Sequence, residues 1–356
     1  MSSSTAQRPA GHSAGTAGGR GLRRPTLEEV AALAGVGRGT VSRVINGSPR
    51  VSDRTRAAVE QAVAELGYVP NRAARTLVTS RTDAIALVVP EAETRLFSEP
   101  YFSGIISGVC AELAETDMQL LLVLVRNQRE RDRLSAYLRA QRVDGVLLVA
   151  VHCDDPLPGV LEDLRIPTVL AGRRGDDESL SYVAADNAGG ARSAVRHLLA
   201  QGRERIATIT GPLDMDAARA RLAGYHDALA EAGHDRREDL VGLADFTEQG
   251  GRAAMRELLD RVPDLDAVFC ASDVLAAGAL QVLRAAGRRV PEDVALVGFD
   301  DSIVARHTDP ALTSVRQPIE LMGRTMTRLL LDEIADPALR SRQLVLATEL
   351  VVRDST

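Results

Sequence analysis

Arginine and small polar side chains gather on one arc of a short helix predicted over residues 38–45. At about 100° per residue, Val41, Val44 and Ile45 share one side of that helix. The opposite arc carries Arg38, Gly39, Ser42, Arg43 and Asn46. A planar guanidinium donates two hydrogen bonds at once to guanine or to a phosphate, and small polar groups beside it can reach neighbouring base edges. These residue types predict contact with the major groove of DNA.

A helix-turn-helix is predicted to position that face. Thr26 and Glu29 have the spacing of a capping box, which starts an amphipathic helix that ends at Gly35-Val36-Gly37. Beyond the short helix, a third one is expected from Ser52 to Leu66, ending at Gly67. Periodicity alone leaves open a plain three-helix bundle with a solvated face.

Three glycines at alternate positions suggest a second interpretation, a loop that binds a dinucleotide. Gly35, Gly37 and Gly39 have the beginning of that spacing, but they follow a helix rather than a strand. The dinucleotide fingerprint GxGxxG also requires a third glycine at position 40, where this sequence has Thr40. The dinucleotide interpretation is therefore rejected.

The charge is divided unevenly along the chain. The net charge is −6, yet residues 1–81 contain twelve arginines and five acidic residues, a net of +7, which leaves −13 for the rest. The sequence contains no lysine. A basic head on an acidic body predicts that contact with nucleic acid is confined to the head.

Composition excludes several classes of protein. The chain has 356 residues, of which 45% are hydrophobic and 26% charged, as in soluble proteins of two or three domains. No apolar run approaches the roughly 20 residues that a membrane span needs, and the N-terminal stretch lacks the apolar segment of a secretory signal. Cys110, Cys153 and Cys270 lie in apolar segments and are interpreted as core residues of a protein in the reducing cytoplasm.

Near-continuous apolar strands alternate with helical patterns from about residue 83 onward. This alternation predicts parallel sheets covered on both faces, and the length favours two α/β lobes with a ligand site in the cleft between them. An enzyme on a similar fold is disfavoured because the sequence contains no metal-spaced histidine cluster and no nucleotide fingerprint. We therefore expect no catalytic residues, no metal and no cofactor.

Several motifs in order resemble the LacI/GalR family of transcriptional regulators. They are TLEEVAALAGVGRGTVSRVING, VSDRTRAAVEQAVAELGYVPNRAARTL, QRVDGVLL, ADNAGG, RERIATITGP, ARLAGYHDAL, VPEDVALVGFDDS and DPALTSVRQP. The resemblance implies an all-α helix-turn-helix domain at 25–69 after a disordered arm at 1–24, a hinge helix and linker at 70–82, and a periplasmic-binding-protein-like α/β effector domain at 83–356. A periplasmic sugar-binding protein would share that body, but residues 26–77 exclude it.

The resemblance also implies that the polypeptide crosses between the two lobes of the effector domain three times. Lobe 1 is expected to hold about 83–185 and 314–343, and lobe 2 about 186–313 and 344–356. The crossovers then fall near Asp186, Thr313 and Leu344.

The family's DNA-binding positions can be carried over residue by residue. They fall on Arg38, Gly39, Thr40, Ser42, Arg43, Asn46, Arg50, Ser52, Thr55, Asn71, Arg72, Ala74, Arg75 and Leu77. Leu77 matches a leucine that is wedged into the minor groove, and two copies of it require a dimer on a near-palindromic operator. Gly37 departs from the family's usual capping serine at little cost. Gly39 cannot read a base through a side chain, so Arg38 is expected to carry more of the discrimination, unless Gly39 lets the backbone approach the DNA.

The resemblance places an effector site around the cleft. Its residues are Tyr101, Phe102, Arg173, Arg221, Phe246, Asp273, Asp300 and Gln317. A guanidinium fork, a carboxylate and an aromatic face suit a sugar or a sugar derivative. The alternative effector is a nucleoside or purine that acts as a co-repressor.

Structural roles remain open for several of these residues. Asp273 could be only the N-cap of the following helix, Asp300 could cap a turn, and Tyr101 and Phe102 could be core residues. Arg173 could form a salt bridge between the lobes.

Overall fold

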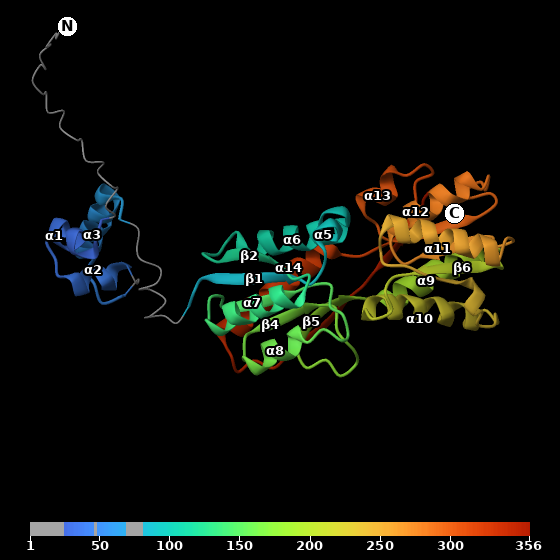
Figure 1. Ribbon diagram of the computed structural model, residues 1–356. Helices are drawn as coiled ribbons and strands as arrows, with labels where there is room; N and C mark the ends of the chain where they lie inside the picture. The colour runs from blue at the N-terminus through green and yellow to red at the C-terminus, as the bar shows by residue number, and fades with distance from the viewer. Residues whose placement is uncertain (1–24, 46–47, 69–80) are drawn as a thin grey trace, which may run out of the picture. The chain divides into compact units, whose positions relative to one another are not determined.

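The computed structural model describes residues 25–45, 48–68 and 81–356, and it divides into two compact units, Met1–Arg81 and Thr82–Thr356. The first unit contains three helices, α1 (Leu27–Ala34), α2 (Arg38–Ile45) and α3 (Asp53–Leu66), drawn in blue in Figure 1. They enclose a small core that includes Val30, Val41 and Val59, each fully buried. The predicted helix-turn-helix is confirmed.

Caps end the helices where the sequence places them. Glu29 N donates to Thr26 Oγ1 at 3.3 Å and Thr26 N donates to Glu29 Oε2 at 2.8 Å, which completes the capping box at the start of α1. Gly35 (φ 65°) ends α1 in the left-handed conformation. The turn that separates α1 from α2 therefore depends on local residue types, and it leaves the polar arc of α2 facing away from Val41 and Val44.

The second unit contains two six-stranded sheets (Figure 1). The first sheet has the strand order β11-β5-β4-β3-β1-β2, and all its strands run parallel. Its strands are β1 (Ala84–Val89), β2 (Gln119–Leu124), β3 (Gly145–Leu148), β4 (Thr168–Ala171), β5 (Ser181–Ala185) and β11 (Gln343–Leu346). The second has the order β12-β10-β9-β8-β6-β7 and is parallel except for β12. Its strands are β6 (Ile206–Thr210), β7 (Val241–Leu243), β8 (Ala267–Cys270), β9 (Ala295–Asp300), β10 (Thr313–Arg316) and β12 (Glu349–Val351).

Helices pack on both faces of each sheet, as the continuous apolar strands predict. Lobe 1 carries α5 (Glu93–Ser98), α6 (Pro100–Leu113), α7 (Gln128–Arg139), α8 (Leu157–Asp163) and α14 (Ile319–Ala335). Lobe 2 carries α9 (Asn187–Ala200), α10 (Asp216–Glu231), η1 (Glu238–Leu240), α11 (Glu248–Arg261), α12 (Asp273–Ala285) and α13 (Ile303–His307). None of the helices in the described part of the chain combines the length and the apolar character that a membrane crossing requires.

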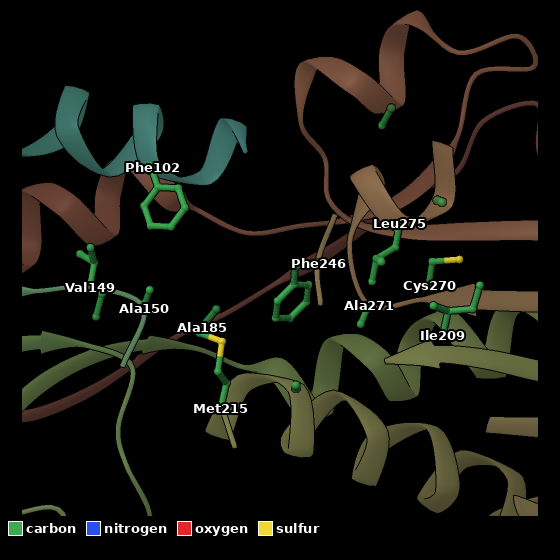
Figure 2. Close-up of a cluster of buried hydrophobic side chains, with 14 of the residues drawn as sticks. Phe102, Val149, Ala150, Ala185, Ile209, Met215, Phe246, Cys270, Ala271 and Leu275 are labelled. Atoms are coloured by element: carbon green, nitrogen blue, oxygen red, sulfur yellow. The ribbon is translucent and has the colours of Figure 1, made fainter. Parts of the chain in front are cut away.

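One apolar cluster continues from lobe 1 into lobe 2. It joins Phe102 and Ala150 of the first lobe to Met215, Phe246 and Ala271 of the second, as Figure 2 shows. Two further clusters lie on the opposite faces of the two sheets. Because Ala150, Phe246 and Ala271 follow the carboxyl ends of strands, the region where a ligand is expected is also where the lobes contact each other.

The second and third crossovers lie farther along the chain than the resemblance implied. The crossover after β5 falls at Asp186, as expected. β10 pairs with β9, so residues 314–316 belong to lobe 2, and β11 pairs with β5, so residues 344–346 belong to lobe 1. A strand whose backbone groups are hydrogen-bonded to one sheet cannot leave it midway, so the chain changes lobes only after Arg316 and after Leu346.

The cysteines do not share one environment. Cys270 is fully buried, Cys153 is partly exposed and Cys110 is exposed on the outer side of α6. The interpretation of all three as core residues was wrong for Cys110. An apolar neighbourhood in the sequence did not reveal which side of its helix faces solvent.

Candidate functional site

The polar arc of α2 is exposed on the first unit. The Arg38 side chain is 72% exposed and forms an ion pair with Glu28 at 3.0 Å, while Arg43 is exposed one turn later. No atom lies within 4 Å of a Cβ added at Gly39, so the backbone is open at that point. Thr40 and Ser42 are partly exposed on the same helix. The arc therefore presents guanidinium groups and open backbone to solvent.

The remaining predicted DNA contacts divide into two groups. Arg50 is exposed, and Ser52 and Thr55 lie at the start of α3 with their hydroxyls 2.9 Å apart. Ser52 Oγ also accepts from Thr55 N at 3.4 Å, so it caps α3. Predicted contacts outside the described residues are Asn46, Asn71, Arg72, Ala74, Arg75 and Leu77.

A cavity that opens to solvent lies in the cleft between the lobes of the second unit. Seven of the eight predicted effector residues line it: Tyr101, Phe102, Arg173, Arg221, Phe246, Asp300 and Gln317. They come from α6, α10, the end of β9, the loops after β4 and β7, and the crossover segment after β10. Strand ends and helix starts from both lobes therefore meet around one space.

Arg221 and Asp300 form the buried polar centre of the cavity. Arg221 donates from Nε to Asn187 Oδ1 at 2.8 Å and from Nη1 to the Ala271 carbonyl at 2.5 Å, with Asp300 Oδ1 3.7 Å away. Gln317 Nε2 donates to the same Asp300 oxygen at 2.5 Å. Burial raises the pKa of Asp300 to about 6, although the Arg221 charge and the Gln317 hydrogen bond act in the opposite direction. The same burial lowers the pKa of Arg221.

Asp273 does not line the cavity. It is fully buried, and both of its carboxylate oxygens accept hydrogen bonds: Oδ1 from Ser314 Oγ at 2.5 Å and Oδ2 from Ser302 N at 2.7 Å. The alternative role as an N-cap is wrong as well, because Ser272 caps α12 by accepting from Leu275 N. Burial raises the pKa of Asp273 to about 7, with the Asp300 charge adding to the effect. Asp273 thus joins the start of β10 and the segment after β9 to the start of α12.

For Phe102 and Arg173, the structural role that the sequence left open is compatible with a place in the cavity wall. Phe102 is 2% exposed and belongs to the core, yet it also borders the cavity, where its ring meets that of Tyr101 edge-on at 5.5 Å. Arg173 Nε donates to Asp216 Oδ2 at 3.0 Å, which is an ion pair between the lobes. These residues serve structure and the cavity wall at the same time.

Five polar cavity residues were not predicted from the sequence: Arg95, Glu99, Asn187, Asp216 and Ser272. Arg95 pairs with Glu99 at 2.5 Å and with Glu91, and its guanidinium lies 5.5 Å from the centre of the Phe246 ring. Burial raises the pKa of Glu99 to about 7. The i, i+4 spacing of Glu91, Arg95 and Glu99 was a usable signal for an ion-paired helix, but not for a cavity wall.

Contacts beside the cavity hold the lobes together. His152 of lobe 1 lies 2.7 Å from Asp214 of lobe 2 through Nδ1 and 3.1 Å from Glu91 through Nε2. These carboxylates raise the pKa of His152 to about 8, and the hydrogen bond to Glu91 has the largest effect. Arg219 Nη1 contacts Cys153 Sγ at 2.7 Å across the same boundary. The loop before α10 and its first turn therefore anchor lobe 2 on lobe 1.

The charges around the cavity suit a neutral polar ligand. Each of the three arginines that line it contacts a carboxylate: Arg95 that of Glu99, Arg173 that of Asp216, and Arg221 that of Asp300. Paired guanidinium and carboxylate groups can still donate to and accept from hydroxyls, whereas an anionic ligand would have to compete with the carboxylates. No group of three or more histidine, cysteine or acidic side chains in the described part of the chain is arranged to hold a metal ion.

Two family models match this chain. Residues 26–71 match bacterial regulatory proteins of the lacI family, and residues 195–356 match a periplasmic binding protein-like domain. The HTH-type transcriptional regulator CelR of Thermobifida fusca is 58% identical over 335 residues, which cover 94% of this chain and 98% of that protein. The HTH-type transcriptional repressor CytR of Escherichia coli strain K12 is 34% identical, covering 93% of this chain and 96% of that protein.

Solved structures agree with these matches. A complex of the transcriptional regulator CelR with cellobiose is 56% identical, with a TM-score of 0.76, and covers 94% of this chain and 100% of that chain. The lac repressor dimer bound to operator and to the anti-inducer ONPF is 28% identical, with a TM-score of 0.82, and covers 94% of this chain and 99% of that one. Since relatives of this identity span nearly its whole length and both of its units match, the chain belongs to the lacI family of bacterial regulatory proteins.

Proposed function

We propose that this protein is a transcriptional repressor that binds a near-palindromic operator as a homodimer and responds to a neutral saccharide in the interlobe cleft. The observation that carries the effector class is the relative in complex with cellobiose, 56% identical over 94% of this chain. The carboxylate-paired arginines and the Phe246 ring of the cavity support it, because such a wall offers hydrogen bonds to hydroxyls and an apolar face to sugar C–H groups. A β-linked glucose disaccharide is the effector we favour over a nucleoside.

The proposed mechanism couples the cleft to the DNA. A ligand that contacts Arg221 and Asp300 of lobe 2 and Tyr101 of lobe 1 fixes the angle between the lobes. That angle then sets the separation of the two segments that join the effector domains to the helix-turn-helix units. Coupling of this kind is worth about 1–3 kcal/mol, a change of about 5- to 150-fold in operator affinity.

Purified full-length protein tests both halves of the proposal. We expect cellobiose to raise the melting temperature and glucose and cytidine to have smaller effects, because a ligand that binds the folded state stabilises it by mass action. In a gel-shift titration, the protein should prefer a symmetric duplex selected from random sequence, and cellobiose should change that affinity. Stabilisation by cytidine but not by saccharides would reject the effector class. Equal affinity for symmetric and random duplexes would reject the operator proposal.

An exposed apolar groove is the surface that we assign to the second copy. It runs between α5, β2 and α13 and includes Phe97, Leu122 and Ile303, which are 81%, 42% and 57% exposed. Apolar side chains this exposed and this close together are typical of protein interfaces. Because the groove takes residues from both lobes, a change in the angle between the lobes would reach the partner.

A charge in that groove should separate the dimer. Leu122→Arg places a guanidinium where two apolar faces meet, and an uncompensated charge there is expected to raise the dimer dissociation constant at least about 30-fold. Leu243→Arg is the matched control, because Leu243 is 65% exposed on the edge strand β7 and does not line the groove. Sedimentation equilibrium measures both variants. An unchanged dimer in Leu122→Arg would move the interface elsewhere.

A further inference from the structure

The Phe246 ring occupies space that is free only because residue 211 is a glycine. Gly211 follows β6, and a Cβ built on it would lie 2.1 Å from Phe246 Cζ and 2.3 and 2.5 Å from Cε2 and Cε1. Real Cβ atoms essentially never come within 3.0 Å of another heavy atom. The φ of Gly211 lies outside the left-handed region, so its backbone conformation does not require glycine. The ring is what requires it.

Phe246 is held in this position by its surroundings. Its φ is 65°, an unfavourable conformation for an aromatic residue, and its side chain is almost entirely buried. The guanidinium groups of Arg95 and Arg221 lie 5.5 and 5.9 Å from the ring centre, the first from lobe 1 and the second from lobe 2. Figure 2 shows the ring where the two lobes meet. The ring is thus fixed by two cationic neighbours that also line the cavity.

We infer that Gly211 is a positioning residue that sets the length of saccharide the cleft accepts, an inference that rests on the proposed function. The ring packs against Gly211 and borders the cavity. A side chain at position 211 must displace the ring, and the open space that the ring borders is the cavity. A ring displaced in that direction takes space from the ligand and tilts the aromatic face. A disaccharide, which fills more of the cavity, loses more than a monosaccharide.

Gly211→Ala tests this inference by the smallest possible change. We expect the affinity for cellobiose, measured by calorimetry, to fall at least about tenfold, equivalent to about 1.4 kcal/mol. The affinity for glucose should fall less, so the ratio of the two dissociation constants changes. Gly159→Ala is the control, because Gly159 lies in α8 and has no atom within 4 Å of an added Cβ. That variant should bind both sugars as the wild type does.

Introducing Gly211→Ala into the Phe246→Leu variant separates an effect that acts through the ring from a general disturbance of the fold. Leucine lacks the ring atoms that an alanine at position 211 would meet, so Gly211→Ala should cause no further loss of cellobiose affinity in Phe246→Leu. An equal loss in both backgrounds would overturn the inference, as would an unchanged ratio of dissociation constants in the single variant.

The wild type, Gly211→Ala, Phe246→Leu and the double variant also give a measurement that needs no ligand. Gly211→Ala should lower the urea midpoint in the Phe246 background and leave it unchanged in Phe246→Leu. If the wild type binds neither sugar, the effector class under the proposed function is wrong, and the urea midpoints alone then decide whether Gly211 positions the ring. Equal midpoint changes in the two backgrounds would overturn that role.

Discussion

An Arg38→Ala variant should still bind DNA but should lose its preference for one base pair in each half-site. Arg38 is the first residue of α2, its side chain is 72% exposed, and its ion pair with Glu28 is a surface pair worth at most about 1 kcal/mol. It can exchange that partner for a guanine at little cost. A bidentate arginine–guanine contact discriminates by about 1–3 kcal/mol, about 5- to 150-fold, and a symmetric site contains it twice. Selection of binding sites from a random duplex pool measures the lost position directly.

Arg75→Ala is the matched comparison, because the family resemblance assigns Arg75 to the hinge. It should weaken binding to all sequences by a similar factor and reduce the slope of log affinity against log salt by about 1. If Arg38→Ala leaves the selected motif unchanged, Arg38 does not read a base. Since Gly39 has open backbone and no side chain, another residue of α2 would then have to supply the discrimination.

Local patterns predicted the elements well because their causes are local. The capping box at Thr26, the left-handed Gly35 and the alternation of buried and exposed positions in α2 all follow from residues within one or two helical turns. The parallel sheets follow from apolar strands separated by helices. The chain length favoured two lobes with a cleft, and the resemblance added the residues around it, of which seven of eight line the cavity.

The features that the sequence did not predict depend on contacts between distant segments of the chain. In the sequence, Asp273 resembles a cap or a ligand contact at the start of a helix, yet its carboxylate accepts from Ser302 and Ser314, 29 and 41 positions away. Arg95 and Glu99 have the spacing of a surface ion pair, but Phe246 of lobe 2 packs against the Arg95 guanidinium and both residues line the cavity. The crossovers after Arg316 and Leu346 depend on which sheet accepts each strand. Such facts are fixed by tertiary packing, which no window of the sequence contains.

Arg221→Leu should abolish the response to the effector and should also destabilise the effector domain by about 3–5 kcal/mol, since it leaves a buried carboxylate without its cation. Arg221 is 5% exposed, and its guanidinium is 3.7 Å from Asp300 and 3.8 Å from the centre of the Phe299 ring. Arg196→Leu is the control, because Arg196 makes an exposed ion pair with Glu231 and its loss should cost less than about 1 kcal/mol. Urea unfolding and cellobiose calorimetry measure the two effects.

The stability lost in Arg221→Leu should depend on pH with a predictable sign. The pKa of Asp300 is about 6 in the folded protein against the usual 3.8, so its contribution to stability is fully present below pH 3.8 and is lost as the pH rises through about 6. Removing Arg221 takes away a charge that lowers this pKa, and the pKa rises further. At pH 5 the variant therefore holds a neutral Asp300, and its deficit relative to the wild type should be smaller than at pH 8.

The double variant Arg221→Leu/Asp300→Asn separates charge from recognition. An amide at position 300 needs no cation, so most of the lost stability should return, and the part of the pH dependence that comes from Asp300 should disappear. Cellobiose binding should not return, because the guanidinium fork that is proposed to hold adjacent hydroxyls is still missing. A double variant that binds cellobiose as the wild type does would show that Arg221 only neutralises Asp300. The cavity would then recognise its ligand through the other polar residues of its wall.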